Sequence, residues 1–92
     1  MATFLMLGKY SSEGLNGASV SRTKTAIVAI EKAGGKVQSM YALLGQYDLA
    51  FIIDFPGTAE AMKISLELAK LTGIGFTTFP AVGIKEFDRL IG

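Results

Sequence analysis

Two hydrophobic segments joined by a short polar turn constrain the fold of this chain more than any other feature. Val37–Leu44 (VQSMYALL) is followed by Gly45-Gln46 and then by Tyr47–Phe55 (YDLAFIIDF). Short apolar segments that meet at a glycine-containing turn are typical of paired strands. Gly45 at the first turn position suits a type II′ turn, which needs a positive φ there. The sequence therefore predicts a β-hairpin with a two-residue turn.

Strands and helices alternate along the rest of the chain. Asn16 or Ser19 is expected to cap the first helix and Thr58 the second, because their oxygens accept free backbone N–H groups. Glycines at 34, 35 and 73 end these helices, and Pro80 indicates an edge strand. The expected strands are Thr3–Tyr10, Val37–Leu44, Tyr47–Phe55 and Ile74–Val82, and the expected helices are Gly17–Ala33, Ala59–Leu71 and a short Gly83–Ile91.

This order, β-α-β-β-α-β followed by a short helix, predicts the fold. With right-handed crossovers it gives a ferredoxin-like α+β sandwich, in which two helices cover one face of a four-stranded antiparallel sheet. A length of 92 residues fits one domain over residues 1–92.

Counting outward from a two-residue turn assigns side chains to the two sheet faces, because they alternate along each strand. One set is uniformly apolar and is expected to lie under the helices: Leu44, Ala42, Met40, Tyr47, Leu49, Phe51 and Ile53. The other set mixes apolar and polar residues: Val37, Ser39, Tyr41, Leu43, Asp48, Ala50, Ile52 and Asp54. The second set is too hydrophobic to face water, so we expect another subunit to cover it.

Composition supports self-association and restricts the chemistry. Hydrophobic residues make up 50% of the chain and charged residues 18%, so apolar side chains are in surplus for so small a domain. We expect a homodimer or a multiple of dimers. The chain has no Cys and no His, which removes thiolate nucleophiles and thiolate metal sites as well as the commonest general base and the commonest transition-metal ligand. We expect no catalytic residues, no metal and no cofactor.

Charge and hydropathy bear on the partners of the chain and on its cellular compartment. The net charge is +1 and the basic residues are scattered, so nucleic acid is not favoured as a partner. The N-terminus lacks the features of a signal peptide, and no apolar run is long enough to span a membrane. A cytoplasmic protein without a membrane partner is expected.

Four residues are candidates for ligand binding at the covered face. Tyr41 lies opposite the small Ala50, which leaves room for a cavity, and Ser39 shares that face. Asp48 is placed either to bind a donor group of a ligand or to accept N–H groups of the turn or an adjacent loop. Tyr10 is placed either at the mouth of the cavity or at a solvated edge.

These features resemble the GYD domain family over Ser21–Phe87. The matching elements are Gly34-Gly35, Tyr41, Gly45-Gln46-Tyr47-Asp48, Leu49–Phe55, Ala59–Leu71 and Thr77-Thr78-Phe79-Pro80-Ala81. Asp54 departs from the family, whose members often carry glutamate there. The family is similar to dimeric α+β barrel proteins and to the effector-binding domains of Lrp/AsnC-type regulators, which bind amino acids at subunit interfaces.

The resemblance implies a homo-oligomeric module that binds a small molecule between the sheets of two subunits, or a regulatory module of that kind. No helix-turn-helix segment precedes Thr3, so a stand-alone sensing module is expected. Two alternatives stay open. One is a small cofactor-independent enzyme of the dimeric α+β barrel type, such as an oxygenase or an isomerase. The other is a purely structural assembly module in which Ile84–Ile91 docks on a neighbour.

Overall fold

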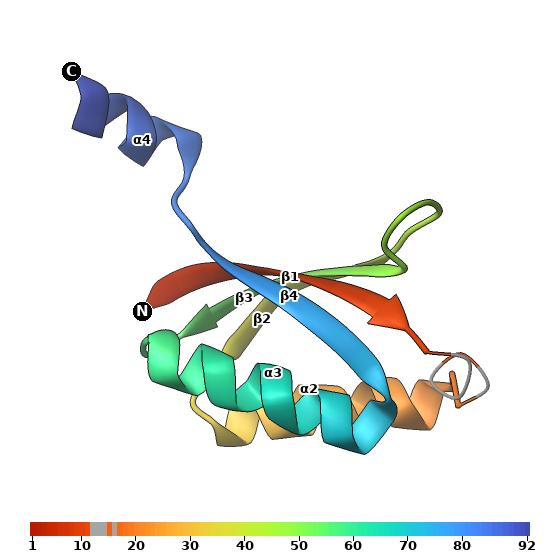
Figure 1. The fold of residues 1–92 in the computed structure, drawn as a ribbon. Helices are drawn as coiled ribbons and strands as arrows, with labels where there is room; N and C mark the ends of the chain where they lie inside the picture. The colour runs from red at the N-terminus through yellow and green to blue at the C-terminus, as the bar shows by residue number, and fades with distance from the viewer. Residues whose placement is uncertain (12–14, 16) are drawn as a thin grey trace.

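The structure, a computed structural model, describes residues 1–11, 15 and 17–92. Within these residues the elements are β1 (Ala2–Tyr10), α2 (Val20–Lys32), β2 (Lys36–Ala42), β3 (Leu49–Phe55), α3 (Thr58–Thr72), β4 (Ile74–Ala81) and α4 (Ile84–Ile91). The strands form one sheet in the order β2-β3-β1-β4, and each neighbouring pair is antiparallel. Helices α2 and α3 lie on one side of the sheet (Figure 1). The predicted ferredoxin-like α+β fold is confirmed, with β4 at the edge.

The predicted pairing between β2 and β3 is confirmed over four residue pairs: Ser39 with Ile52, Met40 with Phe51, Tyr41 with Ala50 and Ala42 with Leu49. Beyond them the loop is longer than predicted. The last backbone hydrogen bond runs from the N–H of Leu43 to the carbonyl of Asp48, at 2.8 Å. Residues 44–47 therefore form a four-residue loop, in which Gly45 has a φ of +130°.

The predicted pair Leu44–Tyr47 is wrong because the hairpin end bonds to β1 instead. The N–H of Asp48 donates to the carbonyl of Gly8 at 2.8 Å. Leu44 lies at the tip of the loop and is fully exposed, so it does not lie under the helices as expected. Figure 1 shows this tip rising on the side of the sheet opposite α2 and α3.

A β-bulge changes the face of one further residue. The register shifts between Val37 and Ser39, so that Val37 pairs with Ile53. Val37 packs against the core on the helix side, and its predicted place on the other face is wrong. The reason is the extra residue, Gln38, which a simple alternation from the turn cannot include.

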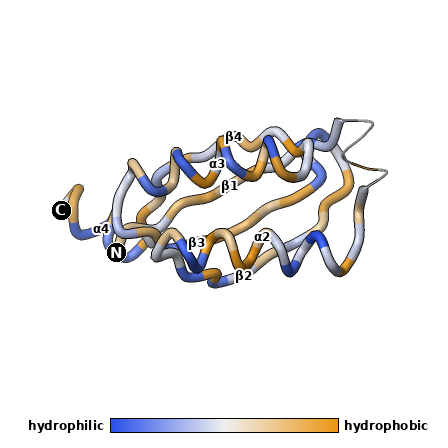
Figure 2. The backbone as a smooth tube through the Cα atoms, turned by 90° about the horizontal axis from the view of Figure 1, so that it is seen from below, coloured by the Kyte–Doolittle hydropathy of each residue, from blue (hydrophilic) through white to orange (hydrophobic). Residues whose placement is uncertain are grey.

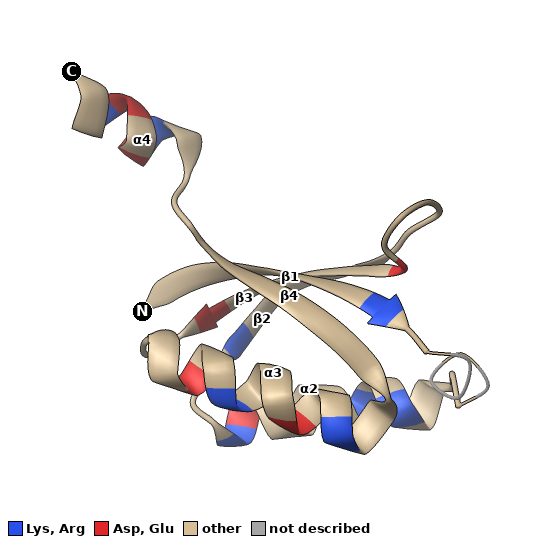
Figure 3. Cartoon of the chain, viewed as in Figure 1, with Lys and Arg blue, Asp and Glu red and all other residues tan. Residues whose placement is uncertain are grey.

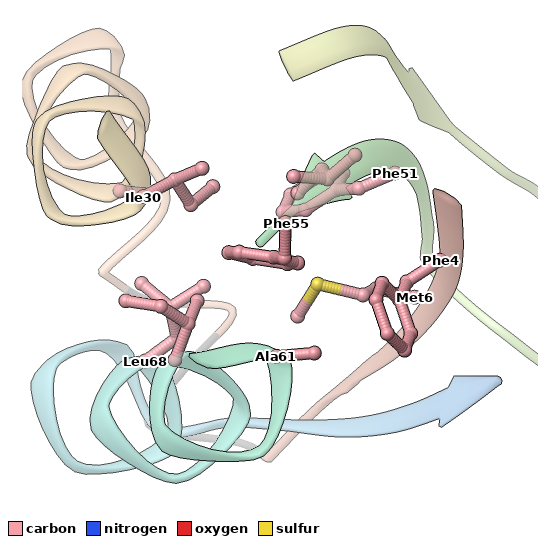
Figure 4. Packing of buried hydrophobic residues seen from close by; sticks show 10 residues of the cluster. Phe4, Met6, Ile30, Phe51, Phe55, Ala61 and Leu68 are labelled. Carbon is pink, nitrogen blue, oxygen red and sulfur yellow. The ribbon is translucent and has the colours of Figure 1, made fainter. Parts of the chain in front are cut away.

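The core lies between the sheet and the two helices (Figure 4). The largest fully buried side chains are Phe55, Met6, Ile30, Ile53, Ile64 and Leu68. Phe4 and Phe55 meet edge to face with their ring centroids 5.8 Å apart. Met62 and Leu66 of α3 are each 61% exposed. Helix α3 turns the Ala61, Ile64 and Leu68 side inward, which leaves Met62 and Leu66 at the margin.

The helix ends follow the glycines and one of the expected caps. Ser19 caps α2, and its hydroxyl accepts the N–H of Arg22 at 3.1 Å; Asn16 lies outside the described residues. Gly73 ends α3 in the left-handed conformation with a φ of +70°. Thr58 does not cap α3, because the helix already begins at Thr58 and Gly57 is its N-cap. No helix of the described residues is long and apolar enough to cross a membrane.

Candidate functional site

The side of the sheet opposite α2 and α3 is called the open face here. Its residues follow from the pairing registers: Thr3, Leu5, Leu7, Lys9, Ser39, Tyr41, Ala50, Ile52, Asp54, Thr77, Phe79 and Ala81. Leu5 lies between Ile52 on β3 and Phe79 on β4, which makes an apolar row across three strands. Leu5 and Ile52 are half-buried, and Phe79 is 44% exposed. This row is the hydrophobic centre of a face that no helix covers in Figure 1.

Charged side chains avoid the middle of the open face. Figure 3 shows that Lys, Arg, Asp and Glu gather on the helices and leave most of the sheet uncharged. The charged residues within the four strands are Lys9, Lys36 and Asp54, and each lies near the end of its strand. An uncharged centre with a charged margin is the arrangement found at subunit interfaces.

Ser39 and Tyr41 lie together on β2 at the open face. Their neighbour Met40 packs against the core on the other side, which fixes the direction of both by alternation. Tyr41 is 57% exposed and pairs with Ala50, which in turn pairs with Leu7 on β1. Ala50 presents only a methyl group opposite Tyr41, and the hydroxyls of Ser39 and Tyr41 can each donate and accept a hydrogen bond.

Asp48 fastens the hairpin loop to the end of β1. Its Oδ2 accepts the backbone N–H of Tyr10 at 2.8 Å, and its own N–H donates to the carbonyl of Gly8. Lys9 Nζ adds a third link by donating to the carbonyl of Gln46 at 3.0 Å. The carboxylate of Asp48 therefore has a structural role at this position.

Tyr10 lies on the helix side of the sheet. Its partner on β4 is the buried Ile74, and the Arg22 guanidinium lies over its ring, 5.3 Å from the ring centroid, in a cation–π arrangement. Both residues line a cleft of about 210 Å³ on this side, and Tyr41 lines it as well. Among the described residues Ser39 and Asp48 do not line it, so the four predicted residues are not gathered at one place.

Arg22 is a residue of this cleft that the sequence reasoning missed. The signal was present in the helix periodicity, because Arg22, Ala26 and Ile30 follow at four-residue steps and so share one face. Ala26 and Ile30 are buried, which draws Arg22 to the mouth of the cleft. Asp48 does not line this cleft among the described residues.

Asp54 is held at the opposite end of β3. Its Oδ1 accepts hydrogen bonds from Thr3 Oγ1 and from Gln38 Nε2, each at 2.7 Å, and Gln38 also reaches Oδ2. The hydrogen bond from Thr3, then that from Gln38, lowers the pKa of this carboxyl below its usual value, against a smaller opposing effect of burial. Asp54 joins three strands and has no contact with Asp48.

The carboxylates of the described residues do not form a metal site. Among the residues that the structure describes, no three Asp or Glu side chains come close enough to hold a metal ion. Every buried side-chain nitrogen or oxygen within the same residues has a hydrogen-bond partner.

The sheet with one helix-covered and one open face defines a ferredoxin-like α+β domain. The family model of the GYD domain matches residues 4–91. The chain therefore belongs to the GYD domain family.

Among solved structures the chain is similar to the leucine response regulatory protein (LrpA) of Mycobacterium tuberculosis. The TM-score is 0.59 at 8% sequence identity, and the match covers 89% of this chain and 51% of that one. The chain thus spans about half the length of LrpA, and at this identity the likeness shows the fold. No curated protein matches the chain.

Proposed function

We propose that this GYD domain is a homo-oligomeric module that binds a small molecule, or regulates through such binding, and that pairs with a second copy through its open face. The observation that supports this most is the apolar row of Ile52, Leu5 and Phe79 across an uncovered sheet. In an antiparallel sheet with one face in water, the side chains on that face are mostly polar. The open face instead carries apolar side chains at its centre. Packing two open faces together removes the row from water and forms a dimer, or the unit of a larger assembly.

The ligand is proposed to lie between the two sheets, at Ser39 and Tyr41. Tyr41 stands beside the small Ala50, so two facing sheets leave space there, and the hydroxyls orient a polar ligand. In this proposal Asp48 holds the loop at one end of the site through the N–H of Tyr10. The similar structure is named a leucine response regulatory protein, which makes apolar amino acids the first ligands to test.

The proposed setting is the cytoplasm, with neither nucleic acid nor a membrane as partner. A chain without Cys suits a reducing compartment, where disulfides do not form. The module is proposed as a binding protein rather than an enzyme, because a chain that also lacks His has only carboxylates, amines, phenols and hydroxyls for acid–base work.

The test is a thermal unfolding screen with the amino acids and their 2-oxo acids. A ligand at about 100 times its Kd adds about 2.7 kcal/mol, which for a domain of this size raises Tm by about 10–20 °C. We expect a shift with at least one apolar amino acid, reduced in Tyr41→Phe and Ser39→Ala. Tyr47→Phe is the matched control, since Tyr47 lies in the hairpin loop and should keep the shift.

Two results would contradict the ligand proposal. A shift that survives in Ser39→Ala would move the ligand elsewhere, for example to the cleft beside Tyr10 and Arg22, which Tyr41 also lines but Ser39 does not. A dimer that responds to none of the compounds would favour the purely structural assembly module.

A further inference from the structure

Helix α4 exposes a complete apolar side. The exposed fractions of its apolar side chains are 71% for Ile84, 72% for Leu90, 69% for Ile91 and 45% for Phe87. No residue of this helix is buried. An isolated helix of eight residues is not stable in water, because helices below about 12–15 residues need tertiary packing. The apolar side of α4 therefore requires a surface to pack against.

The position of α4 excludes its own helix layer as that surface. Figure 1 shows α4 on the side of the sheet opposite α2 and α3, and Figure 2 shows it beyond the end of the sheet. Only Val82 and Gly83 separate it from β4. Phe79 and Val82, which lead into the helix, are 44% and 54% exposed. The apolar residues of α4 thus continue an apolar line that starts on the open face.

An apolar groove lies on the helix side of every copy, between α3 and β4. This α3/β4 groove has a volume of about 230 Å³, and its lining includes Phe4, Met62, Leu66, Phe76 and Pro80. Met62 and Leu66 are each 61% exposed, which is unusual for two large side chains one helical turn apart.

Two of the three hydroxyl side chains that line the groove are paired with each other. Ser65 Oγ lies 2.6 Å from Thr78 Oγ1 and donates to the carbonyl of Ala61 at 2.8 Å. An apolar group that covers these two hydroxyls therefore leaves neither of them without a hydrogen-bond partner.

We propose that α4 of one copy packs its apolar side into the α3/β4 groove of a second copy. This rests on the proposed pairing of open faces, which places the partner on the side toward which α4 projects. Packed sheets lie about 10 Å apart. The two linker residues Val82 and Gly83 span up to about 7 Å and the eight-residue helix about 12 Å, so the end of α4 reaches up to about 19 Å from β4. This length carries α4 past the edge of the partner's sheet to the side on which its α3 lies.

The second copy is the occupant that the structure favours, because one chain carries both the apolar helix and the apolar groove. Each copy then fills one groove and has its own groove filled, which leaves neither surface exposed in a closed dimer. The covered residues extend the sheet interface without a break, from Phe79 through Val82 to α4.

Cross-linking between single-cysteine variants tests the contact, since the chain has no native Cys. The Leu90→Cys variant, with its cysteine on α4, and the Leu66→Cys variant, with its cysteine in the groove, are mixed and unfolded. They are then refolded together and oxidised. A disulfide forms only where two Cα atoms come within about 7 Å. We expect a linked dimer to form at least ten times faster than with the matched control pair, Leu90→Cys and Leu71→Cys. Leu71 is also exposed on α3, at 55%, but does not line the groove.

A second variant tests the contact without a cysteine. Phe87→Ser should raise the dimer Kd at least tenfold in sedimentation equilibrium, whereas Lys85→Ser on the same helix should leave it within about twofold. Equal effects of the two substitutions would overturn the proposal.

The outcomes separate this inference from the proposed function. A wild-type dimer with no linked product, or with equal product from the control pair, overturns the docking of α4 and leaves the sheet pairing intact. In a variant that carries both Leu90→Cys and Leu66→Cys, a disulfide within one chain would show that α4 folds back on its own groove, which also overturns the docking of α4 on a second copy. A wild-type monomer in the same sedimentation run would remove both proposals.

Discussion

Truncating Phe79 should weaken the proposed dimer about a thousandfold. An aromatic side chain buries about 150–250 Å², and Phe79 is 44% exposed in the single chain, so about 90 Å² of its surface remains to be covered. At about 25 cal/mol per Å² this area is worth about 2 kcal/mol in each copy. A two-fold dimer contains the residue twice, which gives about 4 kcal/mol and about 10³ in Kd.

Sedimentation equilibrium over a dilution series measures this effect directly for Phe79→Ala. The control is Leu71→Ala, which removes a large side chain of 55% exposure from the helix layer, outside the proposed interface. We expect the control to leave Kd within about threefold of wild type. Equal dissociation constants for Phe79→Ala and Leu71→Ala would refute the reasoning, because they would show that Phe79 stays in water in the assembly.

Three further predictions concern the hairpin, the paired glycines and pH. Asp48→Ala leaves the N–H at the end of β1 without its acceptor and should lower the free energy of unfolding by about 1–3 kcal/mol in a urea titration; an unchanged value would show that water replaces the carboxylate. Gly35→Ala should destabilise by about 1–3 kcal/mol, because the added Cβ would lie 2.8 Å from a side-chain atom of Phe55. Gly75→Ala, with open space around its Cβ, is the control, and equal losses would contradict the packing explanation. Asp54 has a lowered pKa in the folded state, so its contribution to stability is present above the ordinary value of about 4 and is lost as pH falls through the folded pKa. Urea midpoints at pH 6 and pH 3 should therefore differ less in Asp54→Asn than in wild type, and an identical difference would contradict the assignment.

The topology was predictable because its signals are local. Glycines at helix ends, an edge proline and one hairpin turn determine an element order that right-handed crossovers convert into a single fold. The register of β2 and β3 was predictable because the observed four-residue loop over residues 44–47 has the same centre, Gly45-Gln46, as the predicted two-residue turn. It was correct at Tyr41 and Ala50, the pair on which the candidate site depends.

The errors arose where non-local contacts outweigh the local pattern. Gln38 is bulged out of the ladder and its amide binds the Asp54 carboxylate, a contact between two strands that no turn signal indicates. The apolar Leu44 is typical of a strand, yet it lies in the hairpin loop. The N–H of Asp48 bonds to the carbonyl of Gly8 on β1, and the loop is longer than a two-residue turn. Counting outward from a turn includes neither a bulge within the hairpin nor a hydrogen bond to a third strand.

The candidate site was only partly accessible from sequence. Ser39 and Tyr41 share a face because alternation along β2 requires it, so they could be grouped correctly. Tyr10 could not be placed, because its side follows from the register of β1 against β4, two strands far apart in sequence. Its contact with Arg22 likewise joins a strand end to a helix start across a loop.

Native mass spectrometry of the purified protein tests the pairing of open faces, because it reports the number of subunits and any retained small molecule together. We expect an even number of copies, with the dimer as the smallest unit, and added mass where a ligand is retained. A monomer at concentrations well above the Kd expected for an interface of this kind would show that the open face needs no second copy, which would contradict the proposed pairing.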